Sequence, residues 1–338
     1  MIILTNGLTD VADEGFLKVA NSLIKRIKSR DADNVFIVTY ERGSEFSDKH
    51  VEANKLLLNK NLLATIRKRR EDVLYVPFPA KPIATALRIF ILSLFSKKGL
   101  RVVWVQKSSL NAAAKLLIKL SRAELVVLSK ESKDYFSNVV KEDRILYLKT
   151  GVDTEKFKPV SLETQKSLKQ KYGLDPDRPV ILHVGHLKKG RNIAQLLKLN
   201  HRNQILIVLS TLFKRDADEE LRKLFQNAPN VRLIEEYLPS IEEIYQLSDL
   251  YFFPVVESGN CIDVPLSCLE AAACNKPIVT SEYGEMKEFS GKEGFVFIDS
   301  FDEERLNQLV CEGLKAADAD IRGSVLEYDW TRSVNTLI

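Results

Sequence analysis

The sequence predicts an α/β protein with two doubly wound, parallel-sheet domains, and three observations carry this prediction. The chain has 338 residues, about twice the usual length of one domain. Short apolar runs alternate with helical patterns throughout, as in parallel sheets that are covered on both faces. A polar stretch with three prolines, residues 158–179, interrupts this alternation near the middle of the chain. We therefore expect one domain on each side of that stretch.

The first half contains six apolar runs that predict strands. They lie at 1–5, 34–40, 73–78, 101–106, 124–129 and 145–150. The helix after the first run has apolar residues at i, i+3 and i+4 spacing from Phe16 to Ile27, which predicts one buried face. Helical stretches also separate the other runs, so crossover connections between parallel strands are expected.

The second half repeats the same rhythm. Its predicted strands lie at 179–185, 204–210, 231–236, 249–255, 277–281 and 294–298. We place an N-terminal domain at 1–157, a linker at 158–178, a C-terminal domain at 179–325, and a last helix at 326–338 that packs back on the first domain.

Composition is that of a globular protein that buries a core, with 45% hydrophobic and 28% charged residues. No apolar run approaches the roughly 20 residues that span a bilayer. The start, MIILTNGL, lacks the basic flank and cleavage site of a secretory signal. The four cysteines form no CxxC pair. A reducing cytoplasmic location is therefore expected.

The charge is unevenly distributed. Residues 1–150 carry 27 Lys and Arg against 16 Asp and Glu, a balance of +11, whereas the remainder carries 23 against 30, a balance of −7. An apolar segment at 83–95 is followed by Lys97, Lys98 and Arg101, and RKRR stands at 67–70. A helix lying in an anionic membrane surface fits this pattern, as does a core helix beside a solvated basic patch.

The segment from Glu257 to Gly284 is the strongest candidate for chemistry. It predicts a loop at the carboxyl end of a strand, a helix that begins near Leu266, and a further strand. Glu257 and Glu270 bracket this loop. Ligands of open α/β sheets bind beyond the carboxyl ends of strands, and a helix N-terminus there suits a phosphate. An ordinary βαβ unit with solvated acids is the alternative.

A second cluster, HVGHLKKGRN at 183–192, follows the first strand of the second domain and opens a predicted helix. Gly185 permits a tight turn, and His186, Lys189 and Arg191 supply cationic or switchable donors. Such donors suit a diphosphate, while a basic helix cap is the alternative reading. Neither GxGxxG nor GxxxxGK[ST] follows a strand, which disfavours a nicotinamide site and a P-loop.

Five stretches in a fixed order resemble glycosyltransferase family 4, which comprises retaining enzymes of the GT-B fold. They are TGVDTEKFKP, HVGHLKKGRNIAQLL, SDLYFFPVVESGN, PLSCLEAAACNKPIVTS and YDWTRSV. The likeness covers roughly residues 120–338, and the first half shares only the strand–helix rhythm. It implies two Rossmann-like domains, a nucleotide-sugar donor on the second domain in the cleft between the two, and an acceptor side on the first.

The resemblance implies roles for basic and backbone groups. Arg191 falls where the family has a Lys that grips the donor diphosphate, and His186 falls on the family's Arg. Lys189 would assist them. The backbone of Leu266 and Ser267 would meet the diphosphate.

The resemblance also implies roles for the acids and the flanking loops. Glu270 matches the second Glu of the E-x7-E motif, which binds ribose hydroxyls. Ile262 occupies the first position, so we assign that role to Glu257, with Asp263 as the rival. Tyr237 and Leu238 lie where the family holds the base. In the first domain, Gly7 matches the family's early glycine loop.

The first half departs from the family in lacking its mid-domain His, since that region reads VVWVQKSS with Gln106 and Lys107. A UDP-sugar 2-epimerase-like isomerase and a non-catalytic GT-B subunit therefore stay as alternatives to a hexosyltransferase. The nucleotide sugar would be a substrate, and we expect no cofactor and no metal. The acceptor would be a glycan or lipid-linked, and the protein peripheral on the inner membrane face. Nucleic acid is not an expected partner.

Overall fold

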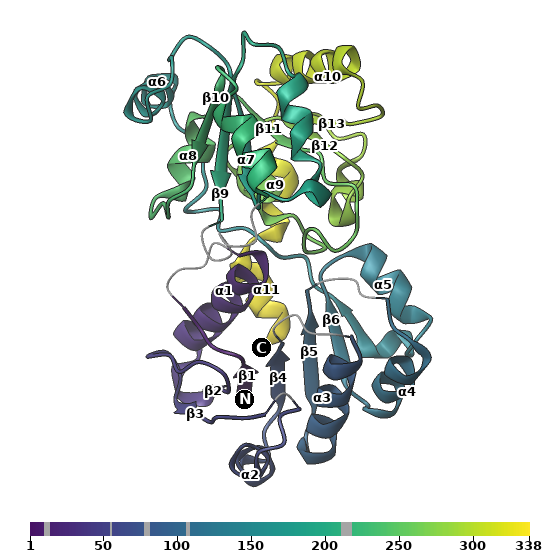
Figure 1. The fold of residues 1–338 in the computed structure, drawn as a ribbon. Coiled ribbons are helices and arrows are strands. Elements are labelled where there is room, and N and C mark those ends of the chain that lie inside the picture. The colour runs from purple at the N-terminus through teal and green to yellow at the C-terminus, as the bar shows by residue number, and fades with distance from the viewer. Residues whose placement is uncertain (10–13, 55, 78–81, 106–108, 211–217) are drawn as a thin grey trace. The chain divides into compact units, whose positions relative to one another are not determined.

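The structure is a computed structural model that describes residues 1–9, 14–54, 56–77, 82–105, 109–210 and 218–338. It contains two compact units. Unit 1 comprises residues 1–149 and 330–338, and unit 2 comprises residues 150–329. Each unit is built on one parallel sheet with covering helices (Figure 1), which confirms the predicted α/β class.

The sheet of unit 1 has the strand order β3-β2-β1-β4-β5-β6-β7. Its strands are β1 Ile2–Thr5, β2 Phe36–Thr39, β3 Lys49–His50, β4 Val73–Val76, β5 Leu100–Trp104, β6 Glu124–Val127 and β7 Ile145–Tyr147. In the central register, Leu4 of β1 pairs with Val38 of β2 and with Tyr75 of β4. All six predicted strands are confirmed. The seventh, β3, was missed because its two residues are polar and give no hydrophobic pattern.

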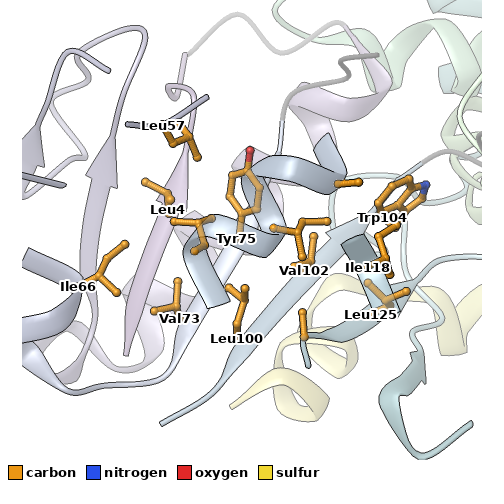
Figure 2. Packing of buried hydrophobic residues seen from close by; sticks show 14 of the residues in the cluster. Leu4, Leu57, Ile66, Val73, Tyr75, Leu100, Val102, Trp104, Ile118 and Leu125 are labelled. Atoms are coloured by element: carbon orange, nitrogen blue, oxygen red, sulfur yellow. The ribbon is translucent and has the colours of Figure 1, made fainter. Parts of the chain in front are cut away.

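Helices of unit 1 follow the strands. They are α1 Gly15–Arg30, α2 Lys60–Arg69, α3 Pro82–Phe95, α4 Ala112–Leu120, α5 Lys130–Ser137 and α11 Trp330–Leu337, with short 3-10 turns at Ala32–Asn34 and Glu142–Arg144. Residues of α2, α3, α4 and α5 share one core with the strands, of which Ile66, Tyr75, Val102 and Ile118 are labelled in Figure 2. These four helices therefore cover the same face of the sheet. The helix expected at 326–338 is α11, which packs against α1 within unit 1.

The sheet of unit 2 has the order β10-β9-β8-β11-β12-β13. Its strands are β8 Val180–Gly185, β9 Gln204–Leu209, β10 Val231–Ile234, β11 Leu250–Phe253, β12 Ile278–Thr280 and β13 Phe295–Phe297. Its α-helices are α6 Leu162–Lys171, α7 Glu219–Gln226, α8 Ile241–Leu247, α9 Leu266–Ala273 and α10 Glu303–Lys315. The 3-10 segments of unit 2 are η3 Lys189–Arg191, η4 Ile193–Lys198, η6 Gly284–Phe289 and η7 Arg322–Tyr328. A regular α-helix was expected from Ile193, but η4 is a short 3-10 segment.

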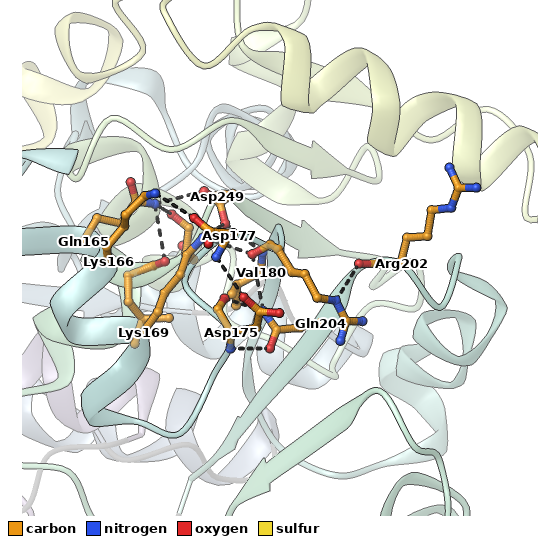
Figure 3. A network of polar contacts seen from close by, with 12 residues as sticks. Gln165, Lys166, Lys169, Asp175, Asp177, Val180, Arg202, Gln204 and Asp249 are labelled. Carbon is orange, nitrogen blue, oxygen red and sulfur yellow. Dashed lines mark hydrogen bonds and ion pairs between the residues drawn. The ribbon is translucent and has the colours of Figure 1, made fainter. Parts of the chain in front are cut away.

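The stretch at 158–178, expected as a linker, lies inside unit 2 and contains α6. A polar network fixes α6 to the starts of the strands (Figure 3). Lys169, which is buried, pairs with Asp249 at 2.7 Å, and Asp249 in turn accepts the N–H of Val180 at 2.7 Å. Gln165 donates to the same carboxylate at 3.0 Å. The polar groups at this edge satisfy one another, so they hold the fold together.

The opposite, carboxyl edge of the unit 2 sheet has a topological switch point between β8 and β11. The chain leaves β8 toward β9 on one side, and β11 continues toward β12 on the other. The crossovers after β8 and β11 therefore diverge, and open α/β sheets bind their ligands beyond the strand ends at such a point. The two candidate segments from the sequence, 183–192 and 257–284, include residues of the loops after β8 and β11.

Candidate active site

Arg191 in η3 lies against the end of β8. Its side chain is only 4% exposed. Gly185 makes this possible, because a Cβ at that position would come within 2.5 Å of Nη2 of Arg191. The guanidinium also lies 5.9 Å from the ring centre of Phe253, which ends β11. Both strands of the switch point thus position this one cation.

The partners of Arg191 do not neutralise it. Nη1 donates to the backbone carbonyl of Asn260 at 2.9 Å, and the guanidinium contacts the thiol of Cys261. Nε is buried without a hydrogen-bond partner, and Arg191 forms no ion pair with any residue that the structure describes. A buried cation without a carboxylate is costly unless an anion binds it. The arrangement therefore favours an anionic ligand.

His183, in the middle of β8, has a neutral imidazole. Its Nδ1 donates to the carbonyl of Phe252 at 2.8 Å, and its ring stacks on Tyr251. Complete burial, with the charge of Arg191 as a second cause, lowers the pKa of His183 to about 3. Because this imidazole is neutral, it does not repel the positive charge of Arg191. No role was expected for this residue from the sequence.

The loop 254–265 is tied to the segment that follows β12. The hydroxyl of Tyr283 donates to the carbonyl of Cys261 at 2.6 Å, and the N–H of Glu285 donates to the carbonyl of Asp263 at 2.9 Å. Gly284 has φ +52° and lies so close to the Asp263 carbonyl that a Cβ would overlap it. These hydrogen bonds fix the position of the loop relative to the segment that follows β12.

Helix α9 begins at Leu266, as predicted, immediately after this loop. Its first hydrogen bonds run from Cys268 and Leu269 to the carbonyl of Pro265. The N–H groups of Leu266 and Ser267 precede them and have no helical acceptor. These groups, with the positive end of the helix dipole, suit an anion.

Glu270 lies one turn into α9 and is only 4% exposed. Its Oε2 accepts the hydroxyl proton of Tyr245 in α8 at 2.6 Å. Burial and the neighbouring Glu270 charge raise the pKa of Tyr245 well above its ordinary value, so this tyrosine stays a donor. A fixed carboxylate of this kind can accept hydrogen bonds from ligand hydroxyls.

The two rivals for the other acidic role differ in exposure. The side chain of Glu257 is exposed, and its carboxylate accepts from Nδ2 of Asn260 at 3.3 Å. Asp263 is buried, at 6% exposure. Asn260 thus connects Glu257 to Arg191. Its side chain donates to Glu257, and its backbone carbonyl accepts from Arg191.

Four further predicted site residues of unit 2 differ in their surroundings. Lys189 is exposed and pairs with Glu220 at 2.7 Å and Asp218 at 3.7 Å, so its charge is already matched by acids at the start of α7. His186 is half-buried. Tyr237 and Leu238 follow β10, with Tyr237 43% exposed. No contact ties either of these two to Arg191 within the described residues.

Gly7 belongs to unit 1, where it follows β1 and packs against Arg42. A Cβ at this position would come within 2.8 Å of the Cβ of Arg42, so the loop requires a residue without a side chain there. Gln106 and Lys107 lie outside the described residues.

Sequence reasoning missed three residues that build the centre. Asn260 contacts both Arg191 and Glu257, Tyr245 contacts Glu270, and His183 lies beside Arg191. The dipeptide Gly259-Asn260 in the loop signalled a turn. No pattern in the sequence pointed to Tyr245 or His183, which lie in ordinary apolar elements.

Comparison with solved structures identifies the class of fold. The solved structure of HepE from Anabaena in complex with UDP has a TM-score of 0.78, with 14% identity, and covers 100% of this chain and 98% of that one. The fold is therefore GT-B, as the sequence predicts.

Comparison of sequences finds a matching family model for part of the chain. Residues 178–315 match the family model "Glycosyl transferases group 1", which confirms the resemblance for that part of the chain. The alpha-maltose-1-phosphate synthase of Mycolicibacterium smegmatis is 24% identical over 233 residues, covering 64% of this chain and 57% of the relative. A Corynebacterium glutamicum "GDP-mannose-dependent monoacylated alpha-(1-6)-phosphatidylinositol monomannoside mannosyltransferase" is 26% identical over 203 residues, covering 55% and 52%. The chain spans about half the length of these curated relatives.

Proposed function

We propose that the protein is a retaining hexosyltransferase that moves a sugar from a nucleotide-diphosphate donor to a lipid-linked or glycan acceptor. The observation that carries this proposal is Arg191, a buried cation at the switch point of the unit 2 sheet that has no carboxylate partner among the described residues. A diphosphate supplies the missing anion. The same group leaves in sugar transfer, so a cation placed there also stabilises the charge that develops on departure.

Arg191 and the start of α9 would bind the diphosphate together. A guanidinium offers a planar fork of donors, and Nε has no other described partner. The N–H groups of Leu266 and Ser267 add backbone donors. In this proposal His186 assists, while Lys189 contributes at long range because its ammonium is paired with acids.

The acids would bind the rest of the donor. Glu270, held by Tyr245, is suited to accept from ribose hydroxyls. Glu257, exposed and linked to Arg191 through Asn260, is suited to orient the sugar hydroxyls and to support positive charge at the ring. Tyr237 and Leu238 would contact the base.

The relatives support the choice of substrates. HepE has been solved with UDP and with UDP-glucose, and one relative is named as GDP-mannose-dependent. That relative's name also specifies a phosphatidylinositol-based acceptor, which favours a lipid-linked acceptor here and a peripheral position on the inner face of the membrane. Retention follows from the family resemblance.

We further propose that transfer needs no divalent metal. Arg191 and the dipole of α9 supply the positive charge that a metal would otherwise bring to the diphosphate. Activity should therefore survive a chelator such as EDTA, whereas abolition by EDTA and recovery with Mg²⁺ or Mn²⁺ would contradict this part.

The proposal is tested by screening nucleoside diphosphates and their sugars for thermal stabilisation, followed by turnover. A ligand at a hundred times its dissociation constant stabilises by about 2.7 kcal/mol. With the matching donor and an acceptor, we expect release of nucleoside diphosphate and a product whose anomeric proton, by NMR, keeps the donor configuration. Accumulation of a sugar epimer would instead identify an isomerase, and stabilisation without turnover a non-catalytic subunit.

A further inference from the structure

The outward face of α3 is apolar where a surface helix is normally charged. The inward face, with Ala86, Ile89 and Leu92, is fully buried in the core of unit 1. On the opposite side, Ile83 is 37% and Leu94 is 66% exposed. Three further apolar residues, all half-buried, share this side at helical spacing: Leu87, Phe90 and Ile91. The one charged residue of the helix, Arg88, is buried.

Helix α4 packs beside α3 and continues the apolar surface. Its core face holds Ala114 and Ile118, whereas Leu116 and Leu120 are each 56% exposed. We define the α3–α4 patch as these exposed and half-buried residues: Ile83, Leu87, Phe90, Ile91, Leu94, Leu116 and Leu120. Apolar groupings on a protein surface mark contacts with proteins or membranes.

Basic side chains border the patch on both sides. Lys97 and Lys98 follow α3, and Lys119 of α4 is exposed like them. Beyond the other side of α3, the neighbouring helix α2 ends in RKRR at 67–70, all exposed. From residue 73 to residue 123 the chain has nine Lys and Arg and no Asp or Glu. Lys97 and Lys119 form no ion pair with any residue that the structure describes.

Arg101, expected from the sequence to join this surface, does not. It donates to Glu124 at 2.9 Å and to the carbonyl of Leu337 at 3.0 Å, so it ties β5 to β6 and α11. The basic border is formed by the lysines around α3 and α4 and by the end of α2.

The positive charge around the α3–α4 patch favours an anionic membrane over a second copy of the chain as its partner. A symmetric contact with a second copy would bring this basic border against itself, and like charges at an interface repel. A bilayer that contains anionic lipid accepts both features. Leucine and phenylalanine enter the boundary of headgroups and chains, while the lysine ammonium groups reach the phosphates.

We propose that α3 and α4 dock unit 1 on an anionic membrane surface, with the α3–α4 patch inserted and the bordering lysines on lipid phosphates. This inference deepens the proposed function, on which its link to a lipid-linked acceptor rests. The docking itself is a property of unit 1 and is measured without any sugar donor.

Co-sedimentation of the full chain with vesicles tests the docking. Phosphatidylcholine vesicles with phosphatidylglycerol should recover the protein, vesicles of phosphatidylcholine alone should recover far less, and added salt should reduce recovery. Leu94→Glu with Leu116→Glu should lower the partition coefficient by about tenfold or more, because a carboxylate resists insertion. Each of Lys97→Gln and Lys119→Gln should lower it about fivefold.

Matched controls separate insertion from general surface charge. Leu162→Glu with Leu224→Glu alters two leucines of unit 2 with similar exposure, 77% and 51%, and should leave vesicle binding unchanged. Nucleoside diphosphate binding in solution should be the same in all these variants. If the wild-type protein binds nucleotide but does not bind vesicles, the docking proposal fails alone. If vesicle binding persists without nucleotide binding, only the proposed function fails.

Three results would overturn the docking proposal. They are equal recovery with neutral and anionic vesicles, no recovery with either, and patch variants that bind like the wild type. Sedimentation velocity adds a fourth: a dimer that Leu94→Glu with Leu116→Glu converts to a monomer would identify the patch as a contact between copies.

Discussion

At the scale of single residues, the centre of unit 2 is defined by a charge that the fold leaves unbalanced. Elsewhere in this unit, buried Lys169 has a carboxylate at 2.7 Å. Among the residues that the structure describes, Arg191 contacts a backbone carbonyl, a thiol and a ring, and no carboxylate pairs with it. The fold tolerates that cost in the free protein, which is the pattern of a ligand site and not of a structural ion pair.

Replacing Arg191 should therefore affect ligand binding more than folding. Arg191→Ala should weaken nucleoside diphosphate binding by about tenfold or more, because a charge-assisted hydrogen bond contributes about 1.5–3 kcal/mol. Arg191→Lys should recover part of this loss, since the charge survives and the planar fork does not. Isothermal titration would measure both variants, and unchanged affinity in a folded Ala variant would remove Arg191 from the site.

The acids should separate into a binding role and a turnover role. Glu270→Gln should chiefly weaken nucleotide binding, because the buried carboxylate is held by Tyr245. Glu257→Gln should chiefly lower turnover of bound donor. Steady-state kinetics and nucleotide titrations would measure both variants. If Asp263→Asn lowers turnover and Glu257→Gln does not, the buried acid fills the role assigned to the exposed one.

His183 should give unit 2 a stability that depends on pH. Its folded pKa of about 3 lies below the ordinary 6.5, so between these values the unfolded chain binds a proton that the folded chain does not. Stability should be complete above pH 6.5 and fall by about 1.4 kcal/mol per pH unit below it. His183→Phe should remove this slope in urea unfolding. The exposed His201→Gln should keep it, and an identical slope in His183→Phe would refute the assignment.

At the scale of elements, the site depends on two glycines, at the end of β8 and at the start of η6, that allow close approach. Gly185 lets Arg191 lie against β8, and Gly284 lets η6 meet the loop 254–265. The loops supply the chemistry, while the parallel strands fix where each loop begins.

Gly185→Ala should disturb the site without touching a charged residue. Its Cβ would fall 2.5 Å from Nη2 of Arg191, so the guanidinium must move. We expect nucleoside diphosphate affinity to fall by at least about tenfold, as for a displaced binding group. The matched control is Gly43→Ala, whose Cβ would meet nothing nearer than 3.8 Å. Equal affinity in both variants, measured by titration, would show that Arg191 need not lie against β8.

An element could be predicted from the sequence where neighbouring residues form a clear pattern. It was missed where its structure depends on residues far apart in the chain. Apolar runs such as 249–255 and 277–281 predicted β11 and β12, because a fully buried parallel strand must be apolar along its length. The edge strand β3 has no such requirement. Burial of Arg191 depends on Gly185 and Asn260, which the fold brings together from two loops, so no local pattern announces it. For the segment 83–95 the sequence left a membrane-surface helix and a core helix as alternatives, and α3 has one face in the core and one exposed.

At the scale of the whole molecule, the chain order and the units do not coincide. Unit 2 is continuous from 150 to 329, whereas unit 1 needs residues 330–338 in addition to 1–149. Helix α11 packs against α1, and Ser333 donates to the carbonyl of Lys149 at 3.0 Å. Trp330, Val334 and Leu337 are buried there.

Ending the chain after Asp329 should therefore destabilise unit 1, although most of unit 1 lies far from residue 329 in the sequence. Three buried side chains contribute on the order of 5 kcal/mol to unit 1. Hydrogen–deuterium exchange should accelerate in α1 and its sheet, while unit 2 keeps its protection. Removing Ile338 alone, which is 53% exposed, should change neither unit. Faster exchange in unit 2 than in unit 1 after the longer truncation would contradict the division.

The same helix sets an order of events during synthesis. The ribosome completes the strands of unit 1 first, yet it must translate residues 150–329 before α11 emerges. At 5–20 residues per second, those 180 residues take roughly 10–40 s. For that interval the surface of α1 that packs against α11 is exposed, while unit 2 can fold. Unit 1 is thus started first and completed last. Until α11 packs against α1, this surface of the nascent chain is accessible to chaperones.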